Sequence, residues 1–263
     1  MNSLNAIKDA SSDLSAIDVS DVHDVLPWDR LQYVARRSET QSGLPFYWTD
    51  GQPTSFKHTP FRQSQFAAKR AFDVVVAGLA VIALLPLLIL VALAVKVTSR
   101  GPVLFRQARE GLHGRSFDTL KFRTMRSDFC DLTGVVQTIK DDPRVTPIGR
   151  FLRRTSIDEL PQLFNVLRGE MSLVGPRPHV SEMRAGGTLY RSLVRYYDRR
   201  LDMLPGITGW AQANGLRGST SNAMLARARI DHDIAYIQNF SLLLDLKIIL
   251  LTVQREFLRG SGD

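Results

Sequence analysis

The sequence is poor in the residues that build disulfides and zinc sites. It has one cysteine, Cys130, so no disulfide can form within the chain. Its five histidines are scattered and lack the paired spacing of a zinc site. It contains neither a phosphate-binding P-loop nor the Gly-x-Ser-x-Gly turn of many hydrolases. Any bound metal is therefore expected to be a hard cation such as Mg²⁺, held by oxygen ligands.

Negative charge is scarce outside the first 30 residues. That segment carries six aspartates against Lys8 and Arg30, which leaves a net charge of +12 for the rest of a chain whose total is +8. Such an excess is typical of proteins that contact nucleic acid, an anionic membrane surface or phosphorylated substrates. Composition alone does not choose among these partners.

One long stretch lacks charge altogether. Residues 74–95 are 22 consecutive uncharged residues rich in Leu, Val, Ala and Ile, which predicts a membrane-embedded helix. The run is too long and begins too late for a cleaved signal peptide, so we expect it to remain in the protein. This segment favours a membrane surface over nucleic acid as the partner of the basic residues.

The sequence leaves two paths through the membrane open. A straight helix of this length reaches about 33 Å and would cross the hydrocarbon core. However, Pro86 lies in its middle and predicts a kink or break. Both flanks are also basic, although positive residues prefer the cytoplasmic side. A segment that enters, breaks at Pro86 and returns would place both flanks on that side. The basic flanking residues are Lys57, Arg62, Lys69, Arg70, Lys96, Arg100, Arg106 and Arg109.

The fold class expected is α+β and mainly helical, in three parts. Residues 1–66 show no sustained period and are predicted to form a flexible polar extension. Residues 67–100 are predicted to form the membrane helix and residues 101–263 the catalytic domain. Within that domain we expect strands at 103–105 and 116–126, helices at 148–154 and 158–168, and a helical region between the Gly/Pro-rich stretches 174–178 and 205–218.

The C-terminal region predicts an amphipathic helix. Asp245 and Lys247 interrupt its apolar pattern, so we expect the helix to lie on the membrane or the core and not to span. Its predicted apolar stripe is Leu242, Leu246, Ile249, Leu250, Val253 and Phe257.

The strongest catalytic candidate is the acidic pair Asp158–Glu159, just before an apolar helical pattern. An acidic pair there is ordinarily a helix cap, and this interpretation stays open. Adjacent helical side chains point about 100° apart, so the two carboxylates would serve different roles. A helix N-terminus keeps a carboxylate ionised and attracts phosphate, which would suit a nucleophile or a Mg²⁺ ligand.

Several basic side chains are candidates for phosphate contact. Arg177 lies between Pro176 and Pro178, which restrict the backbone and pre-position the guanidinium for bidentate contact. Lys121 and Arg123 are two residues apart on a predicted strand and should share a face. Each residue alone could equally be a solvated surface charge. The other candidates are Arg153, Arg154 and Arg217.

Five motifs follow one another between about residues 67 and 258. They are Lys69-Arg-Ala-Phe-Asp73, Leu120-Lys-Phe-Arg-Thr-Met125, Thr155-Ser-Ile-Asp-Glu-Leu-Pro-Gln-Leu-Phe-Asn165, Met171-Ser-Leu-Val-Gly-Pro-Arg-Pro178 and Pro205-Gly-Ile-Thr-Gly-Trp-Ala-Gln212. Together they resemble the bacterial sugar transferases known as monotopic phosphoglycosyl transferases. The resemblance implies transfer of a hexose 1-phosphate from a UDP-sugar to polyprenyl (undecaprenyl) phosphate, with release of UMP, as the first membrane step of exopolysaccharide or glycan biosynthesis.

The resemblance also implies a mechanism and a location. It makes Asp158 the nucleophile of a Mg²⁺-dependent, two-step reaction through a covalent aspartyl phosphosugar, with Glu159 completing an acidic dyad near the metal. It implies a re-entrant membrane helix, interfacial amphipathic helices and a small catalytic domain on the cytoplasmic face of the bacterial plasma membrane. The chain looks like the short, transferase-only form, and assembly into a homo-oligomer is left open. One departure is Leu85, where members often have a serine whose hydroxyl could bond a freed carbonyl.

Three rival functions remain at the level of sequence. A glycosyltransferase would move only the sugar and release UDP instead of UMP. A membrane-bound scaffold for polysaccharide export would suit the polar extension and the amphipathic helix. A nucleic-acid binder is disfavoured, because many basic residues flank the membrane segment and no aromatic stacking motif occurs.

Overall fold

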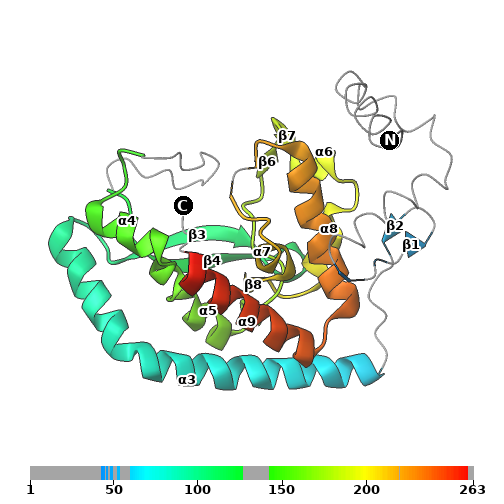
Figure 1. Cartoon of the computed structure of the whole chain (residues 1–263), viewed down its shortest axis with the longest axis horizontal. Coiled ribbons are helices and arrows are strands. Elements are labelled where there is room, and N and C mark those ends of the chain that lie inside the picture. Colours follow the sequence, from blue (N-terminus) through cyan, green and yellow to red (C-terminus); the bar gives the residue numbers. More distant parts are fainter. Residues whose placement is uncertain are drawn as a thin grey trace, which may run out of the picture. The chain divides into compact units, whose positions relative to one another are not determined.

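The computed structural model describes residues 60–126, 142–218 and 220–259, together with short pieces between residues 43 and 53. These residues belong to one compact unit, apart from Gly43. The described part is mainly helical with small two-stranded sheets, as predicted (Figure 1). Most of the predicted extension 1–66 lies outside the described residues, as do Cys130 and most of the segment 127–141.

The long apolar helix α3 (Pro60–Thr98) begins before the predicted boundary at residue 67. Phe66 already packs on Phe240, with ring centroids 4.8 Å apart, so the start of α3 is part of the packed unit. The helix does not end at Pro86. Instead, Figure 1 shows its second part bent away from the line of the first. A bend is expected there because proline lacks an N–H and clashes with the preceding turn.

Helix α3 has two apolar faces in different surroundings. Its inner face is buried against the rest of the unit through Ala77, Leu88, Val91 and Val95. Only 17% of the most apolar window of the helix is buried. An exposed apolar surface of this extent marks contact with a membrane or a partner. The outward residues, between 38% and 85% exposed, are Val74, Val75, Leu79, Ile82, Leu85, Ile89, Leu90, Leu93 and Val97.

A buried polar cluster, here called the anchor cluster, holds the first arm of α3. Lys69 donates to one carboxylate oxygen of Asp245 at 2.6 Å, and the Tyr236 hydroxyl donates to the other at 2.6 Å. Asp245 belongs to α9 (Leu242–Arg259), and Tyr236 belongs to α8 (Ala223–Asn239). One helical turn after Lys69, Asp73 accepts a hydrogen bond from the Ser172 hydroxyl at 2.7 Å. Because buried charges need partners, these contacts define how α3 sits on the domain.

Two arginine side chains donate hydrogen bonds to carbonyl groups at the C-terminal ends of helices. Arg123 donates to the carbonyl oxygens of Ser99 at 2.7 Å and Val95 at 3.3 Å, at the C-terminal end of α3. Arg70 donates to two carbonyl oxygens in the last turn of α5 (Gln162–Arg168). These bonds satisfy carbonyls that a helix end leaves without partners. Both arms of α3 are therefore attached to the same unit.

Two strand pairs contain, or lie close in sequence to, the predicted site residues Lys121 and Arg177. Strands β3 (Leu104–Glu110) and β4 (Ser116–Phe122) form an antiparallel hairpin. Strand β5 (Ser172–Val174) pairs in parallel with β8 (Gly206–Thr208). A side chain at Gly206 would collide with the backbone of Gly175, so this approach requires glycine. The other pairs are β1 (Trp48–Thr49) with β2 (Gln52–Pro53) and β6 (Arg184–Ala185) with β7 (Thr188–Leu189).

The helices correct two predictions. The segment 158–168 is not one helix, because a 3₁₀ turn (Ile157–Glu159) precedes α5. The region between 178 and 205, predicted to be helical, is helical only in part, because the consecutive glycines 186 and 187 adopt positive φ in the turn between β6 and β7. That region contains only the short α6 (Tyr190–Leu193) and the 3₁₀ helix Tyr197–Asp202. The predicted basic helix is confirmed as α4 (Pro147–Arg154), and α7 spans Trp210–Ala213.

Helix α9 is buried through another face than its predicted apolar stripe, which was expected to lie on the membrane or on the core. Leu244, Asp245 and Ile248 are buried, whereas Leu246, Leu250 and Val253 of the predicted stripe are exposed. Asp245, which interrupts the apolar pattern, is buried because it serves the anchor cluster. The core beside it also contains Ala77, Val166, Met171, Val174 and Tyr236.

The anchor cluster predicts a large cost for removing one partner. Asp245→Ala leaves Lys69 buried with only Asp73 nearby, 3.8 Å away. We expect the free energy of unfolding to fall by about 3–5 kcal/mol, as for other broken buried ion pairs. Asp198→Asn is the matched control, because Asp198 pairs with Arg191 at the surface and should cost less than about 1 kcal/mol. Thermal unfolding of detergent-solubilised protein measures both, and equal losses would contradict the assigned role of the cluster.

Candidate active site

The predicted dyad lies in a tight turn between two helices. Helix α4 ends at Arg154, and Ser156 then adopts a left-handed backbone with φ of 54°. This conformation is uncommon for a residue with a side chain and turns the chain into the 3₁₀ segment Ile157–Glu159. The turn leaves Asp158 buried, with 8% of its surface exposed. Local backbone geometry thus sets the dyad at the edge of the core.

Glu159 is the centre of a charge network. Its Oε1 accepts hydrogen bonds from Lys121 at 2.7 Å and from Arg177 at 2.5 Å, and its Oε2 accepts from Arg177 at 3.2 Å. Burial acts to raise the pKa of Glu159, but Arg177 and Lys121 outweigh burial and hold this pKa well below its usual value. Glu159 is therefore ionised, and the structure brings together three of the predicted site residues.

The environment of Asp158 shifts its pKa in the opposite direction from that of its neighbour. Burial raises the pKa of Asp158 to about 6, while the positive charge of Lys121 opposes the rise. Among the described residues, no side chain donates a hydrogen bond to this carboxylate. The prediction that a helix terminus keeps Asp158 ionised is wrong, because α5 begins only at Gln162. The neighbouring cations favour the charged form instead, and a pKa near 6 leaves the carboxylate predominant at pH 7.

Asn165 fixes Lys121 relative to the dyad, a role that the sequence analysis missed. Its side-chain amide is buried, donates to the Asp118 carbonyl at 2.8 Å and accepts from the Leu120 N–H at 3.0 Å. One amide thus joins α5, which follows the dyad, to β4, which carries Lys121. Primary amides suit this task because they donate and accept at once.

Arg153 approaches the dyad from α4. A side chain at Gly149 would collide with the carbonyl of Thr124, so α4 lies directly on the chain that follows β4. Arg153 then donates from Nε to the Thr124 hydroxyl at 2.8 Å. Its positive charge is one of those that favour the ionised form of Asp158. Arg153 therefore belongs to the site, as predicted.

Arg109 is a site residue that the sequence analysis treated only as a flanking charge. It donates to the Pro178 carbonyl at 3.0 Å and to the Gln107 side chain. Burial and the nearby charge of Arg177 lower the pKa of Arg109 to about 10. The hairpin register could have revealed it, because Phe105 faces Lys121 and residues alternate between faces, placing Arg109 on the face of Lys121.

The other predicted basic residues lie elsewhere. Arg123 does not share a face with Lys121, because β4 ends at Phe122 and Arg123 turns to the end of α3. Arg154 is exposed on α4, and Arg217 is exposed in the segment between α7 and α8. The dyad is therefore surrounded by Lys121, Arg109, Arg153 and Arg177. Four cations around two carboxylates leave an excess of two positive charges, which suits a phosphorylated ligand.

The dyad fits a magnesium site only in part. Mg²⁺ is usually held by one or two carboxylates together with substrate phosphates and water. Asp158 offers a carboxylate without a hydrogen-bond donor among the described residues, whereas both oxygens of Glu159 accept bonds from cations. No group of three metal-binding side chains occurs among the described residues. With these residues, a Mg²⁺ ion would need further oxygen ligands from substrate or water.

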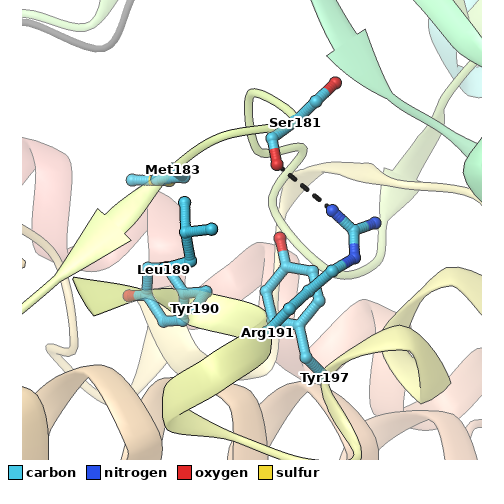
Figure 2. Close-up of a pocket in the computed structure, with 6 residues that line it drawn as sticks. All are labelled: Ser181, Met183, Leu189, Tyr190, Arg191 and Tyr197. Atoms are coloured by element: carbon cyan, nitrogen blue, oxygen red, sulfur yellow. Dashed lines mark hydrogen bonds between the residues drawn. The ribbon is translucent and has the colours of Figure 1, made fainter.

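A small cavity lies beside β7 and α6 (Figure 2). Its volume of about 50 Å³ suits a few ordered waters. Its cation, Arg191, is already paired with Glu110 at 2.7 Å and Asp198 at 2.9 Å, so the cavity does not attract a further anion. We therefore place the functional site at the dyad. The cavity is lined by Ser181, Met183, Leu189, Tyr190, Arg191 and Tyr197.

Comparison with known proteins identifies the family of this chain. The family described as bacterial sugar transferase matches residues 64–259. An exopolysaccharide production protein, PSS, from Rhizobium leguminosarum bv. phaseoli is 54% identical over 194 residues, which cover 74% of this chain and 97% of that protein.

Two longer relatives carry explicit enzyme names. An undecaprenyl-phosphate glucose phosphotransferase from Komagataeibacter xylinus is 53% identical over 203 residues, which cover 77% of this chain and 38% of that protein. A UDP-glucose:undecaprenyl-phosphate glucose-1-phosphate transferase from Klebsiella pneumoniae is 42% identical over 259 residues, which cover 98% of this chain and 53% of that protein. The chain thus spans about half or less of these two proteins. It belongs to the bacterial sugar transferase family, the phosphoglycosyl transferases that its motifs resemble.

Proposed function

We propose that this protein transfers a hexose 1-phosphate from a UDP-hexose to undecaprenyl phosphate and releases UMP. The observation that carries the proposal is the contrast within the dyad. Glu159 is tied to Lys121 and Arg177, whereas no side chain among the described residues donates to the Asp158 carboxylate. A buried, uncommitted carboxylate among cations is suited to attack a phosphorus atom.

The reaction then has two displacements at one phosphorus. An oxygen of Asp158 bonds to the phosphorus that bears the sugar, and the bond from that phosphorus to the bridging oxygen breaks, so UMP leaves with that oxygen. An oxygen of undecaprenyl phosphate next attacks the same phosphorus and displaces the Asp158 carboxylate. The products are undecaprenyl diphosphate hexose and free Asp158.

The basic residues orient and neutralise the diphosphate. Lys121 and Arg177 are held in place by Glu159, so they need not reorganise when phosphate charge arrives. Arg153 extends the positive region on the α4 side, and Arg109 extends it on the β3 side. In phosphoryl transfer, positioning and charge stabilisation supply most of the catalysis.

We further propose Mg²⁺ as the metal of this site, held by Asp158 and Glu159 with substrate oxygens. When bound, it would neutralise phosphate charge. Because Glu159 is committed to two cations, Asp158 is the principal ligand that the chain offers.

We expect the released nucleotide and the trapped intermediate to test the function. Detergent-extracted protein given UDP-glucose, undecaprenyl phosphate and Mg²⁺ should release UMP, and removal of Mg²⁺ with a chelator should reduce the release. With UDP-glucose labelled in the sugar, a sugar phosphate should remain on wild-type protein but not on Asp158→Asn, which lacks the nucleophilic carboxylate. Release of UDP would instead indicate transfer of the sugar alone, and equal labelling of both proteins would exclude Asp158 as the nucleophile.

Removing Arg153 should weaken catalysis more than removing its neighbour. Arg153→Ala should lower kcat/KM roughly 10- to 100-fold, the scale of one charge-assisted hydrogen bond. Arg154→Ala on the same helix is the control and should stay within about twofold, as an exposed charge. Steady-state rates of UMP release give both values. Arg217→Ala is assayed alongside. A loss of kcat/KM as large as that of Arg153→Ala would place the exposed segment that contains Arg217 at the site.

The attachment of both arms of α3 to one unit supports a re-entrant path through the membrane. Lys69 near the start and Val95 near the end both contact the domain that carries the dyad. The apolar stretches before and after Pro86 reach about 18 Å and about 14 Å, each close to half of a 30 Å hydrocarbon core. We therefore propose that α3 enters and leaves on the cytoplasmic face of the plasma membrane, where nucleotide sugars are available to the dyad.

Cysteine labelling tests this path. In a Cys130→Ser background, Ala67→Cys and Arg106→Cys, on either side of the apolar run, should both react with a membrane-impermeant maleimide in inverted vesicles. Neither should react in intact spheroplasts, because both flanks face the cytoplasm. Ile82→Cys is the control and should react only after detergent treatment, because its exposed side chain would be in lipid. If one flank reacted in inverted vesicles and the other in intact spheroplasts, α3 would instead span the membrane.

A further inference from the structure

The turn that carries Arg177 is held through a run of its carbonyl groups. Pro176 and Pro178 have no N–H to donate. The carbonyl oxygens of residues 176–179 nevertheless each accept a hydrogen bond from another part of the chain. The donors, in order, are the Gly206 N–H at 2.9 Å, the Arg200 guanidinium, the Arg109 guanidinium at 3.0 Å and the Glu110 N–H at 2.9 Å. Four successive anchored carbonyls leave this backbone little freedom.

Arg200 is the donor that acts on Arg177 itself. It lies on the 3₁₀ helix Tyr197–Asp202, and its side chain is only 1% exposed. Its Nη2 donates both to the Arg177 carbonyl and to Asp233 at 3.0 Å, while its Nε donates to Asp233 at 3.1 Å. The guanidinium also lies over the Tyr197 ring, 5.4 Å from its centroid. This buried charge is therefore fully oriented.

Neutralising the charge of Arg200 does not require its hydrogen bond to the Arg177 carbonyl. Asp233 on α8 is buried and neutralises Arg200 without help from the turn. A guanidinium presents five N–H donors in a rigid fork, so fixing one edge on Asp233 aims Nη2 at the Arg177 carbonyl. Once that carbonyl is fixed, the side chain of Arg177 leaves the turn in the direction of Glu159.

We propose that Arg200, oriented by Asp233, is a positioning residue that directs the Arg177 guanidinium onto Glu159 and the substrate phosphate. This inference rests on the proposed function, because its test measures UMP release. It assigns to a buried pair outside the dyad a role that differs from stabilising the fold. The role requires Arg177, because Arg200 reaches the site through that residue.

A double-mutant cycle tests the proposal. The variants are Arg200→Lys, which keeps a positive charge but loses the fork, and Arg200→Met/Asp233→Leu, which replaces the buried pair by apolar residues, a change that folded proteins often tolerate. Each is made in wild-type and Arg177→Lys backgrounds, and kcat and KM for UDP-glucose are measured by UMP release. We expect kcat/KM to fall about tenfold in the wild-type background because of misplaced groups. In the Arg177→Lys background the further loss should be less than about twofold, because the coupled partner is already changed.

Thermal unfolding and a control separate positioning from folding. Asp231→Asn lies on the same helix and replaces the charged acceptor of the Tyr196 hydroxyl, 2.6 Å away, by a neutral amide, so it should leave kcat/KM unchanged. Full activity of a folded Arg200 variant would overturn the proposal, as would equal losses in both backgrounds. Failure of both Arg200 variants to fold would assign the pair to stability and would also overturn it. If the wild-type protein released no UMP, the proposed function would fail instead, independently of these comparisons.

Discussion

The buried ion pair between Lys69 and Asp245 is the contact on which the arrangement of this protein depends. Helix α3 has apolar residues on both its inner and its outer face. Lipid tails are as apolar as leucine side chains, so apolar packing alone hardly distinguishes the domain from the bilayer. A buried charge does distinguish the domain from the bilayer, because the domain offers it a partner at a defined position and lipid tails do not. Lys69 with Asp245, and Asp73 with Ser172, therefore select which face of α3 meets the domain.

From this attachment a short series of polar contacts leads to the dyad. Arg70, next to Lys69, donates to the end of α5. Asn165 on α5 holds β4 through two backbone hydrogen bonds, and β4 carries Lys121, which binds Glu159. Each contact has fixed geometry, because a carbonyl or an amide is bound by a directional donor. Helix α3 and the two carboxylates are thus parts of one arrangement, which places the dyad at a set position relative to the exposed apolar surface of α3.

The sequence predicted which residues gather at the candidate site better than it predicted the architecture around them. The dyad, Lys121, Arg153 and Arg177 come together as predicted, because their residue types and motifs directly reflect phosphate chemistry. Arg123 was assigned to the wrong place, because alternation holds only within a strand and β4 ends one residue earlier. Arg109 and Asn165 were missed, because their roles depend on contacts between elements distant in sequence. The burial of Asp245 in α9 was also missed, since a buried aspartate looks like a polar interruption until its partner Lys69 is known.

Glu159 has a consequence for product release in the proposed reaction. In the free protein its carboxylate already balances Lys121 and Arg177, so both cations keep an anion beside them whether or not a diphosphate is bound. A departing UMP would therefore not leave two bare cations behind, which would lower the free-energy cost of its release. An internal carboxylate of this kind would limit product inhibition, at the expense of tighter substrate binding.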